Sequence, residues 1–304
     1  MKKRANNQEE TLLSVYDKDV MRLSVRVGID RSPNTLKVLM QGRKYAASFL
    51  NEEMGISDIL LKKLTPQLIH DFSNWLSTVR HLRGGTVWLV CQQLKGVVTR
   101  AHQRGLIKWN PFAGFRIAKN IRPREYLTEE ELAKLASFEF KNKRLAFARD
   151  LFIFSAFTGM TFIDIKELRP SDIVSFNGAD WIISKRHKTK VPYMVKLLNI
   201  PSEIIMRNKQ QGVLLFGPME YRTMAKRLEK VMSTAGITKK ATFHCARHSF
   251  AILALNKGMP IESLSRILGH TNIKTTQIYA KITMKKIDED MNLLAQQLFD
   301  SSEK

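Results

Sequence analysis

Two apolar stripes at helical spacing, both between Thr35 and Gly105, constrain the fold of this chain more than any other feature. Within each stripe, apolar side chains recur every three or four residues, so they share one face of a helix. The stripes consist of Leu68, Ile69, Phe72, Trp75, Leu76 and Val79, and of Val87, Val90, Leu94, Val97, Val98 and Ala101. Such faces must be buried against one another. The sequence therefore predicts a small all-helical domain over residues 35–109, in which Thr65 and Pro66 start one helix.

The segments on either side of this domain lack its helical pattern. Residues 1–34 are polar and mixed in charge, and we expect an N-terminal tail with room for one short helix. The pattern also stops after Asn110, and residues 110–126 carry four basic residues against one acid, Glu125. The four are Arg116, Lys119, Arg122 and Arg124. We expect this segment to be an extended basic linker that contacts DNA.

A second domain is predicted over residues 127–304. Thr128 and Glu131 have the spacing of a capping box, which starts a helix. Asn177-Gly178 separates two runs rich in Ile and Val, an arrangement typical of a tight β-hairpin. A third strand is predicted from Lys190, because apolar residues alternate there with period two, and helical patterns then resume. The predicted fold class is mainly α with a small antiparallel β-sheet in the second, α+β domain.

The chain is strongly basic, with 50 Lys and Arg against 28 Asp and Glu, a net charge of +22 and a pI near 10.1. This charge indicates a polyanionic partner, and 44% hydrophobic residues exclude a wholly disordered basic tail. Lys and Arg are spread along the chain, which favours nucleic acid over a membrane surface. Because there are only two cysteines and no apolar run near the roughly 20 residues that span a bilayer, we expect a cytoplasmic protein.

Four residues near the C-terminus have a spacing suited to chemistry on a phosphate. His244 and Arg247 are three residues apart, so on a helix they project from one face and could address the same anion. His270 follows Gly269 at a break between two helical patterns, and Tyr279 comes nine residues later. Together they offer an acid or base, an anion clamp and a potential nucleophile.

The pattern His-x-x-Arg, then Leu-Gly-His, then Tyr is similar to the signature of the tyrosine recombinase, or phage integrase, family. The resemblance covers about residues 35–300 and implies a core-binding (SAM-like) domain followed by a catalytic domain. It implies that Tyr279 attacks a DNA phosphate to form a 3′-phosphotyrosine. In that scheme Arg247 and His270 hold the phosphate, His244 is a base, and Lys188 is a general acid on a β-hairpin. The implied activity is site-specific recombination of the integrase or invertase type, without a metal or nucleotide cofactor.

The resemblance also has implications for source and assembly. Three segments, TGMTFIDIKEL, KTKVPYMVKL and HCARHSFA, look most like integrases and invertases of Bacteroidetes mobile elements. The family resemblance implies a homotetramer on paired recombination sites, with room for an accessory DNA-bending protein. A C-terminal apolar stripe matches the helix with which family members dock on a neighbouring protomer. The stripe consists of Ile287, Met291, Leu294 and Leu298.

One position departs from the family motif Thr-Gly-Leu-Arg. Here the last residue is Thr161, which can donate one neutral hydrogen bond but carries no charge. Our hypothesis is that Arg186 supplies the missing charge. It lies two residues before Lys188 and would point to the same face if the hairpin strand continued. In the alternative, Thr161 marks an impaired enzyme. Asp164, three residues on, could either orient a catalytic neighbour or be structural.

The sequence leaves other interpretations open. On the helix predicted from Val87, three basic residues lie off the apolar stripe and are candidates for DNA contacts: Lys95, Arg100 and Arg104. His244 and His248 have the spacing of a zinc-binding helix, but Cys245 stands where the catalytic glutamate would be. A type IB topoisomerase-like activity would share the phosphotyrosine step. A non-catalytic DNA-binding regulator on the recombinase scaffold is the alternative that Thr161 favours.

Overall fold

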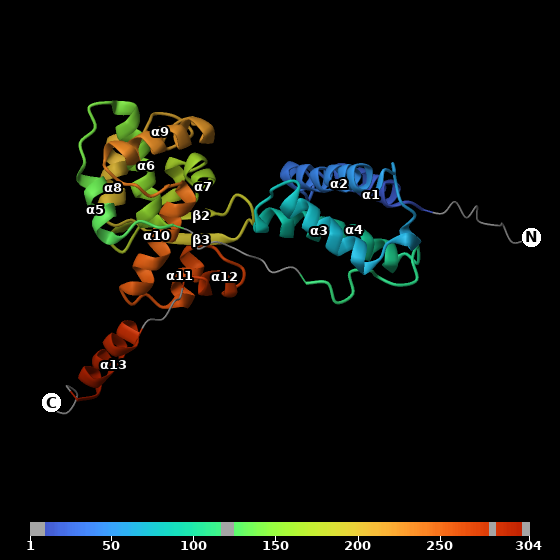
Figure 1. The fold of residues 1–304 in the computed structure, drawn as a ribbon. Coiled ribbons are helices and arrows are strands. Elements are labelled where there is room, and N and C mark those ends of the chain that lie inside the picture. The colour runs from blue at the N-terminus through green and yellow to red at the C-terminus, as the bar shows by residue number, and fades with distance from the viewer. Residues whose placement is uncertain (1–9, 117–124, 280–283, 300–304) are drawn as a thin grey trace, which may run out of the picture. The chain divides into compact units, whose positions relative to one another are not determined.

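A computed structural model describes residues 10–116, 125–279 and 284–299, and Figure 1 shows the course of the chain. The chain divides into two compact units, Met1–Arg122 and Pro123–Lys304. Each unit has a hydrophobic core of its own, as expected of separately packed domains.

The described part of the first unit is helical. Its elements are α1 (Leu12–Ser24), α2 (Pro33–Met54), a 3-10 turn η1 (Leu61–Lys63), α3 (Pro66–Thr78) and α4 (Gly84–Gln103). The predicted start of α3 is confirmed, since Pro66 is its first residue and the Thr65 hydroxyl accepts a hydrogen bond from the Leu68 amide at 3.1 Å. In the core, the Phe49 ring packs edge-on against Phe72, with ring centroids 5.3 Å apart.

The structure differs from the N-terminal tail expected over residues 1–34. Four residues of α1 are buried in the core of the first unit: Leu12, Leu13, Val15 and Tyr16. Asp19 of α1 is only 5% exposed, and it accepts hydrogen bonds from Arg100 at 2.8 Å and Arg104 at 2.9 Å. A buried carboxylate needs such partners, and these lie more than eighty residues away in sequence. Without these distant partners in view, the sequence makes α1 look polar. In the structure, α1 is an integral part of the first unit.

The structure describes only the two ends of the predicted linker, residues 110–126. At its start, Phe112 is buried in the first core and the Phe115 ring packs against His70 at 4.9 Å, so these residues belong to the first unit. Arg116 is exposed, as a contact with DNA would require. Three further basic residues of this segment lie outside the described residues: Lys119, Arg122 and Arg124.

The second unit packs helices around one buried helix, α6 (Lys143–Thr158). The other helices are α5 (Glu129–Ser137), α7 (Phe162–Lys166), a 3-10 turn η2 (Pro170–Asp172), α8 (Asn199–Asn208), α9 (Tyr221–Thr234), α10 (Phe243–Asn256), α11 (Ile261–Ile267), α12 (Lys274–Gln277) and α13 (Met284–Phe299). Residues 148–156 of α6 are buried on every side, as expected of a central helix (Figure 1). α5, α8, α9 and α10 all pack against it. The predicted capping box of Thr128 and Glu131 starts α5.

Three strands complete the second unit and form an antiparallel sheet in the order β1 (Ile173–Phe176), β2 (Ala179–Lys185) and β3 (Pro192–Lys196). The predicted hairpin turn is confirmed, because Asn177 and Gly178 have φ angles of 50° and 72°, the positive values that a type I′ turn needs. The inner face buries Ile182 opposite Val195. The predicted fold class, mainly α with a small antiparallel sheet, is confirmed.

The burial of α1 can be tested with two substitutions on that helix. Leu12 is 3% exposed and Met21 is 71% exposed. We expect Leu12→Ala to lower the free energy of unfolding by about 2 to 5 kcal/mol, because it leaves a cavity in the core. Met21→Ala should change it by less than about 0.5 kcal/mol. Urea unfolding followed by circular dichroism measures both, and equal midpoints for the two variants would mean that α1 is a dispensable tail.

Candidate active site

Helix α10 carries two of the predicted site residues. The Thr242 hydroxyl accepts a hydrogen bond from the Cys245 amide at 3.1 Å and caps the start of the helix. His244 is exposed in the first turn, whereas Arg247 is 4% exposed one turn later. A buried guanidinium keeps its charge, so its surroundings must satisfy it.

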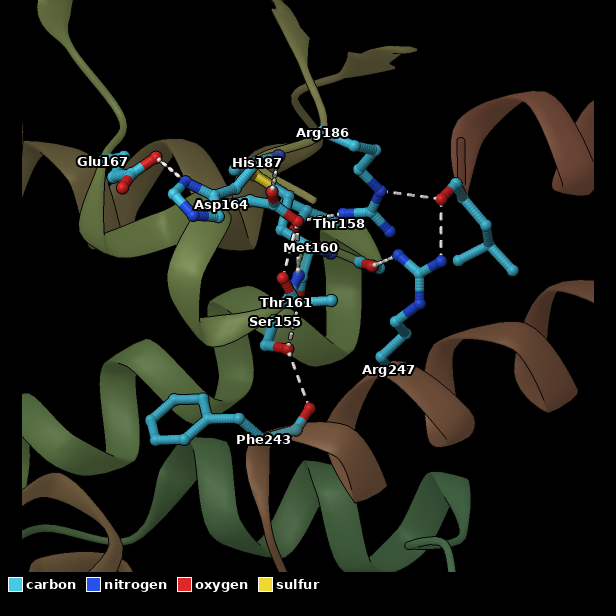
Figure 2. A network of polar contacts seen from close by, with 12 residues as sticks. Ser155, Thr158, Met160, Thr161, Asp164, Glu167, Arg186, His187, Phe243 and Arg247 are labelled. Atoms are coloured by element: carbon cyan, nitrogen blue, oxygen red, sulfur yellow. Dashed lines mark hydrogen bonds and ion pairs between the residues drawn. The ribbon is translucent and has the colours of Figure 1, made fainter. Parts of the chain in front are cut away.

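Arg247 is held by the ends of two other helices. Its Nη1 donates to the carbonyl oxygen of Gly159 at 2.7 Å, just after α6 (Figure 2). Its Nη2 donates to the carbonyl oxygen of Leu268 at 2.7 Å, just after α11. Carbonyls at a helix C-terminus lack partners inside the helix and carry partial negative charge. The two helix ends therefore fix the guanidinium without neutralising it.

His270 is the third residue in this arrangement. Its Nε2 lies 2.9 Å from Nη2 of Arg247, and its Nδ1 lies 2.8 Å from the hydroxyl of Thr276. A guanidinium can only donate, so Nε2 accepts and the ring proton is on Nδ1. Burial lowers the pKa of His270 below its ordinary 6.5, and the nearby Arg186 and His244 lower it further. The imidazole is therefore neutral at pH 7 before any anion binds.

Arg186 directly follows β2 and reaches the same carbonyl as Arg247. Its Nε donates to Leu268 O at 2.8 Å, so this one oxygen accepts from two guanidinium groups (Figure 2). Its Nη1 forms an ion pair with Asp164. Arg186 is 6% exposed, and no described residue accepts a hydrogen bond from its buried Nη2. One charged donor of a buried side chain therefore remains available to a ligand.

The route by which Arg186 reaches the site differs from the predicted one. β2 ends at Lys185, and residues 187–189 form a turn, so the strand does not continue to Lys188. Arg186 consequently points inward, while Lys188 is exposed in the turn. The argument from strand alternation is therefore wrong, although Arg186 does lie beside Arg247.

Asp164 organises this part of the site, and Thr161 is one of its partners. Its carboxylate accepts hydrogen bonds from the Thr161 hydroxyl at 2.6 Å and from the His187 amide at 3.0 Å, in addition to the Arg186 ion pair. Thr161 is thus bound to the residue that holds Arg186. His187 in turn pairs with Glu167 at 2.6 Å. Asp164 therefore links α7 to the start of the hairpin loop.

The charges of the buried groups leave the site positive. Arg186 and Arg247 contribute two positive charges, Asp164 contributes one negative charge, and His270 is neutral. The site therefore has a buried excess of one positive charge, the complement of one phosphodiester. Two further positive groups, Lys188 and Lys190, are exposed in the adjacent turn.

Tyr279 lies at the end of the short segment that begins with α12. Thr276 in that segment is fully buried and bonded to His270. The Tyr279 ring is half-buried and contacts the ring of His248, with centroids 4.8 Å apart. The sequence singled out His248 only for its spacing from His244, and it did not reveal Thr276. Nothing in the spacing of the motif indicates that Thr276 holds His270.

Two of the candidate DNA-binding residues of α4 have a partner that the sequence did not reveal. Arg100 and Arg104 both bind Asp19, yet they remain partly exposed. Lys95 is half-buried. Within the described ranges, no three His, Cys, Asp or Glu side chains gather in a way that could hold a metal ion. The same ranges contain no helix long and apolar enough to span a membrane.

The family follows from comparison with known proteins. The sequence profile of the phage integrase family matches residues 125–286, and that of the phage integrase SAM-like domain matches residues 11–120. The chain belongs to the phage integrase family. The SAM-like match begins at residue 11, just before α1, in agreement with the burial of that helix.

Relatives of this integrase-family protein bear the name tyrosine recombinase. A tyrosine recombinase of Pseudothermotoga lettingae is 30% identical over 197 residues, which cover 62% of this chain and 67% of the relative. The tyrosine recombinase XerC of Oceanobacillus iheyensis is 27% identical over 281 residues, covering 85% and 88%. XerC of Lactobacillus leichmannii is 25% identical over 228 residues, covering 70% and 77%.

Solved structures share the fold. The integrase of the transposon Tn1549, bound to a circular intermediate DNA, superposes with a TM-score of 0.75 at 17% identity, over 93% of this chain and 99% of that one. A lambda integrase tetramer bound to a Holliday junction gives 0.70 at 21% identity, over 91% and 80%. These likenesses support the architecture of the integrase described above.

Gly269 gives a test of how Arg186 is placed. Its φ is +61°, and an added Cβ would lie 2.8 Å from Cγ of Arg186. We expect Gly269→Ala to lose about 1 kcal/mol from backbone strain and, in addition, to displace Arg186 and slow DNA cleavage. Gly258→Ala is the control, because Gly258 has a φ of +85° and nothing within 4 Å of an added Cβ. Equal cleavage rates for both variants would contradict the packing of Arg186 on Gly269.

The pKa of His270 gives a second test. Arg186 lowers this pKa, so Arg186→Gln should move it up toward 6.5, while Arg169→Gln, at an exposed site, should leave it unchanged. Because folding disfavours the imidazolium, the contribution of His270 to stability is present above pH 6.5 and is lost as the pH falls from 6.5 through the lower pKa of the folded state. NMR titration of the imidazole measures the shift. An Arg186→Gln variant with an unaltered His270 pKa would show that the two groups do not interact.

Proposed function

We propose that this tyrosine recombinase cleaves and rejoins DNA at specific sites through a covalent bond between Tyr279 and a DNA 3′-phosphate. The observation that carries the proposal is that Arg247 and Arg186 share the Leu268 carbonyl, while His270 joins Arg247 to Thr276 of the segment that ends in Tyr279. The buried excess of one positive charge suits one phosphodiester. The family membership supports the same chemistry.

In the proposed reaction, the phenolic oxygen of Tyr279 attacks the phosphorus atom, and its proton passes to His244 as base. A free phenol has a pKa of about 10, so few tyrosines are ionised at pH 7 without such help. The bond from phosphorus to the 5′-oxygen breaks, and Lys188 donates a proton to that oxygen. A 5′-hydroxyl of a partner strand then attacks the phosphotyrosine and releases Tyr279. The phosphodiester is therefore re-formed without any hydrolysis step.

Arg186 replaces the arginine of the family motif, whose position is occupied by Thr161 in this chain. Charge on the non-bridging oxygens grows in the transition state, and prearranged cationic donors stabilise it. Arg247 offers one such group, and Nη2 of Arg186 offers the second. His270 can join them as a donor once Nε2, which now accepts from Arg247, takes up a proton beside the negative charge of the bound phosphate. Thr161, through Asp164, helps to hold Arg186 instead of touching the phosphate.

We assign the binding of duplex DNA to basic residues outside the phosphate site. Candidates in the first unit are Lys95, Arg100 and Arg104, and candidates in the linker are Arg116, Lys119, Arg122 and Arg124. Such contacts bind the phosphate backbone and weaken as salt rises. We further propose a homotetramer on paired sites, with room for an accessory DNA-bending protein. On α13, Met291, Leu294 and Leu298 are exposed, as a docking surface for a neighbouring protomer requires, while the Ile287 side chain lies outside the described set.

The source of the protein is a finer part of the proposal. The segments TGMTFIDIKEL, KTKVPYMVKL and HCARHSFA support a mobile element of Bacteroidetes, with integration or inversion as the outcome. A cytoplasmic location fits a substrate of cellular DNA. Both cysteines are buried and free, which also suits a reducing compartment.

The function is tested by trapping the covalent intermediate. A nicked suicide substrate that carries a recombination site should give a protein–DNA adduct with wild type and none with Tyr279→Phe. A non-catalytic regulator would bind the same DNA and give no adduct with either protein. A topoisomerase-like enzyme would give the adduct and relax plasmids, but it would form no recombinant joints on a plasmid with two sites.

The assignment of Arg186 gives a quantitative prediction. Removal of one charged donor from a preorganised oxyanion site costs about 100- to 1,000-fold in rate, so Arg186→Ala should slow adduct formation by roughly that factor. Arg186→Lys keeps the charge but loses the forked geometry, and it should fall between Ala and wild type. Arg169→Ala, at an exposed position of the same unit, is the control. If Arg186→Ala cleaves as fast as wild type, Arg186 does not replace the family arginine.

A further inference from the structure

His248 is buried between two rings that the proposed mechanism uses. It is 5% exposed and directly follows Arg247 on α10. Its ring centroid lies 4.8 Å from that of His244 and 4.8 Å from that of Tyr279. The contact with Tyr279 is edge-to-face, with an interplanar angle of 76°. Edge-to-face packing at this separation is the favoured geometry of aromatic pairs.

The Tyr279 segment is also held by a backbone hydrogen bond and by apolar packing. α12 spans only the four residues Lys274–Gln277, and the Tyr279 amide donates to the Thr276 carbonyl at 3.0 Å. The ring also packs against a small apolar cluster that contains Ala251, Leu264 and Leu268. The edge-to-face contact with His248 adds a directional constraint on the ring.

We propose that His248 is a positioning residue that holds the Tyr279 ring at the angle needed for attack. The inference rests on the proposed role of Tyr279 and deepens it. Arg247 and His248 are consecutive residues of one rigid helix, so a single peptide unit sets the spacing between the phosphate clamp and the contact on the nucleophile. His248 acts through Tyr279 and does not touch the phosphate.

The position of the Tyr279 oxygen has a large effect on the rate at which it attacks the phosphorus. An attacking oxygen must lie close to the phosphorus and in line with the bond that breaks, and misplacement by about 1 Å can cost roughly 100-fold. A tilt of the Tyr279 side chain about its Cα–Cβ bond would move the phenolic oxygen by that much while leaving Arg247 and Arg186 in place. Loss of the His248 ring should therefore slow the covalent attack by Tyr279 without weakening the binding of the phosphate by Arg247 and Arg186.

The first test compares two substitutions on the nicked suicide substrate. His248→Ala removes the ring and should slow formation of the Tyr279 adduct roughly 100-fold. His248→Phe keeps a ring edge without nitrogen atoms and should stay within about tenfold of wild type. If both variants are equally slow, the nitrogen atoms are needed and ring positioning is wrong. If both are as fast as wild type, the contact has no role in attack.

The second test removes Tyr279 from the reaction. In a Tyr279→Phe background, hydrogen peroxide serves as a small nucleophile that attacks the same phosphorus and releases the same 5′-hydroxyl. Adding His248→Ala should leave this peroxide-driven rate unchanged, because peroxide needs no positioned ring. Adding Arg247→Ala should abolish it. A loss of peroxide-driven cleavage on adding His248→Ala would overturn the proposal, since His248 would then support the phosphate site.

The outcomes also separate this proposal from the function on which it rests. If wild type forms no adduct at all, the covalent mechanism through Tyr279 fails. If wild type forms the adduct and peroxide does not act in the Tyr279→Phe background, the comparison of His248→Ala with His248→Phe decides alone. The DNA affinity of the two His248 variants should match wild type, and circular dichroism should show that both are folded at the assay temperature, which excludes a general loss of structure as the cause.

Discussion

The carbonyl oxygen of Leu268 accepts hydrogen bonds from two guanidinium groups, and the rest of the site depends on this shared contact. Arg186 and Arg247 repel each other, and burial removes the water that would screen them. The oxygen lies just after α11, where the helix dipole is negative, so it attracts both. Together with Asp164, it keeps two like charges side by side and leaves a net positive site that an anion completes.

The same contact explains how a family member can lack the usual arginine. A charge at the phosphate can come from any element that reaches it, provided the charge is fixed in advance. In this chain the start of the hairpin loop brings Arg186, and α7 holds it through Asp164. Thr161 fits this arrangement because its hydroxyl bonds to Asp164, whereas a bulky cation at that position would compete with Arg186 for the same carboxylate.

Local signals in the sequence predicted much of the fold. Thr65 with Pro66, the capping box at Thr128 and the Asn177-Gly178 turn each depend on neighbouring residues, and the structure has all three. Features that depend on distant partners could not be predicted. α1 looks polar because the partners of Asp19 are on α4. The inward turn of Arg186 depends on Leu268 and Asp164, and no spacing within the hairpin reveals it.

The central claim is that Arg186 stabilises the charge on the phosphate itself. A DNA substrate with a methylphosphonate at the scissile position tests this directly, because a methyl group replaces one charged non-bridging oxygen. With that charge absent, Arg186→Ala should cleave at nearly the wild-type rate, although it is slow on ordinary DNA. If Arg186→Ala is equally slow on both substrates, Arg186 only supports the fold around Arg247, and the account of the missing arginine is wrong.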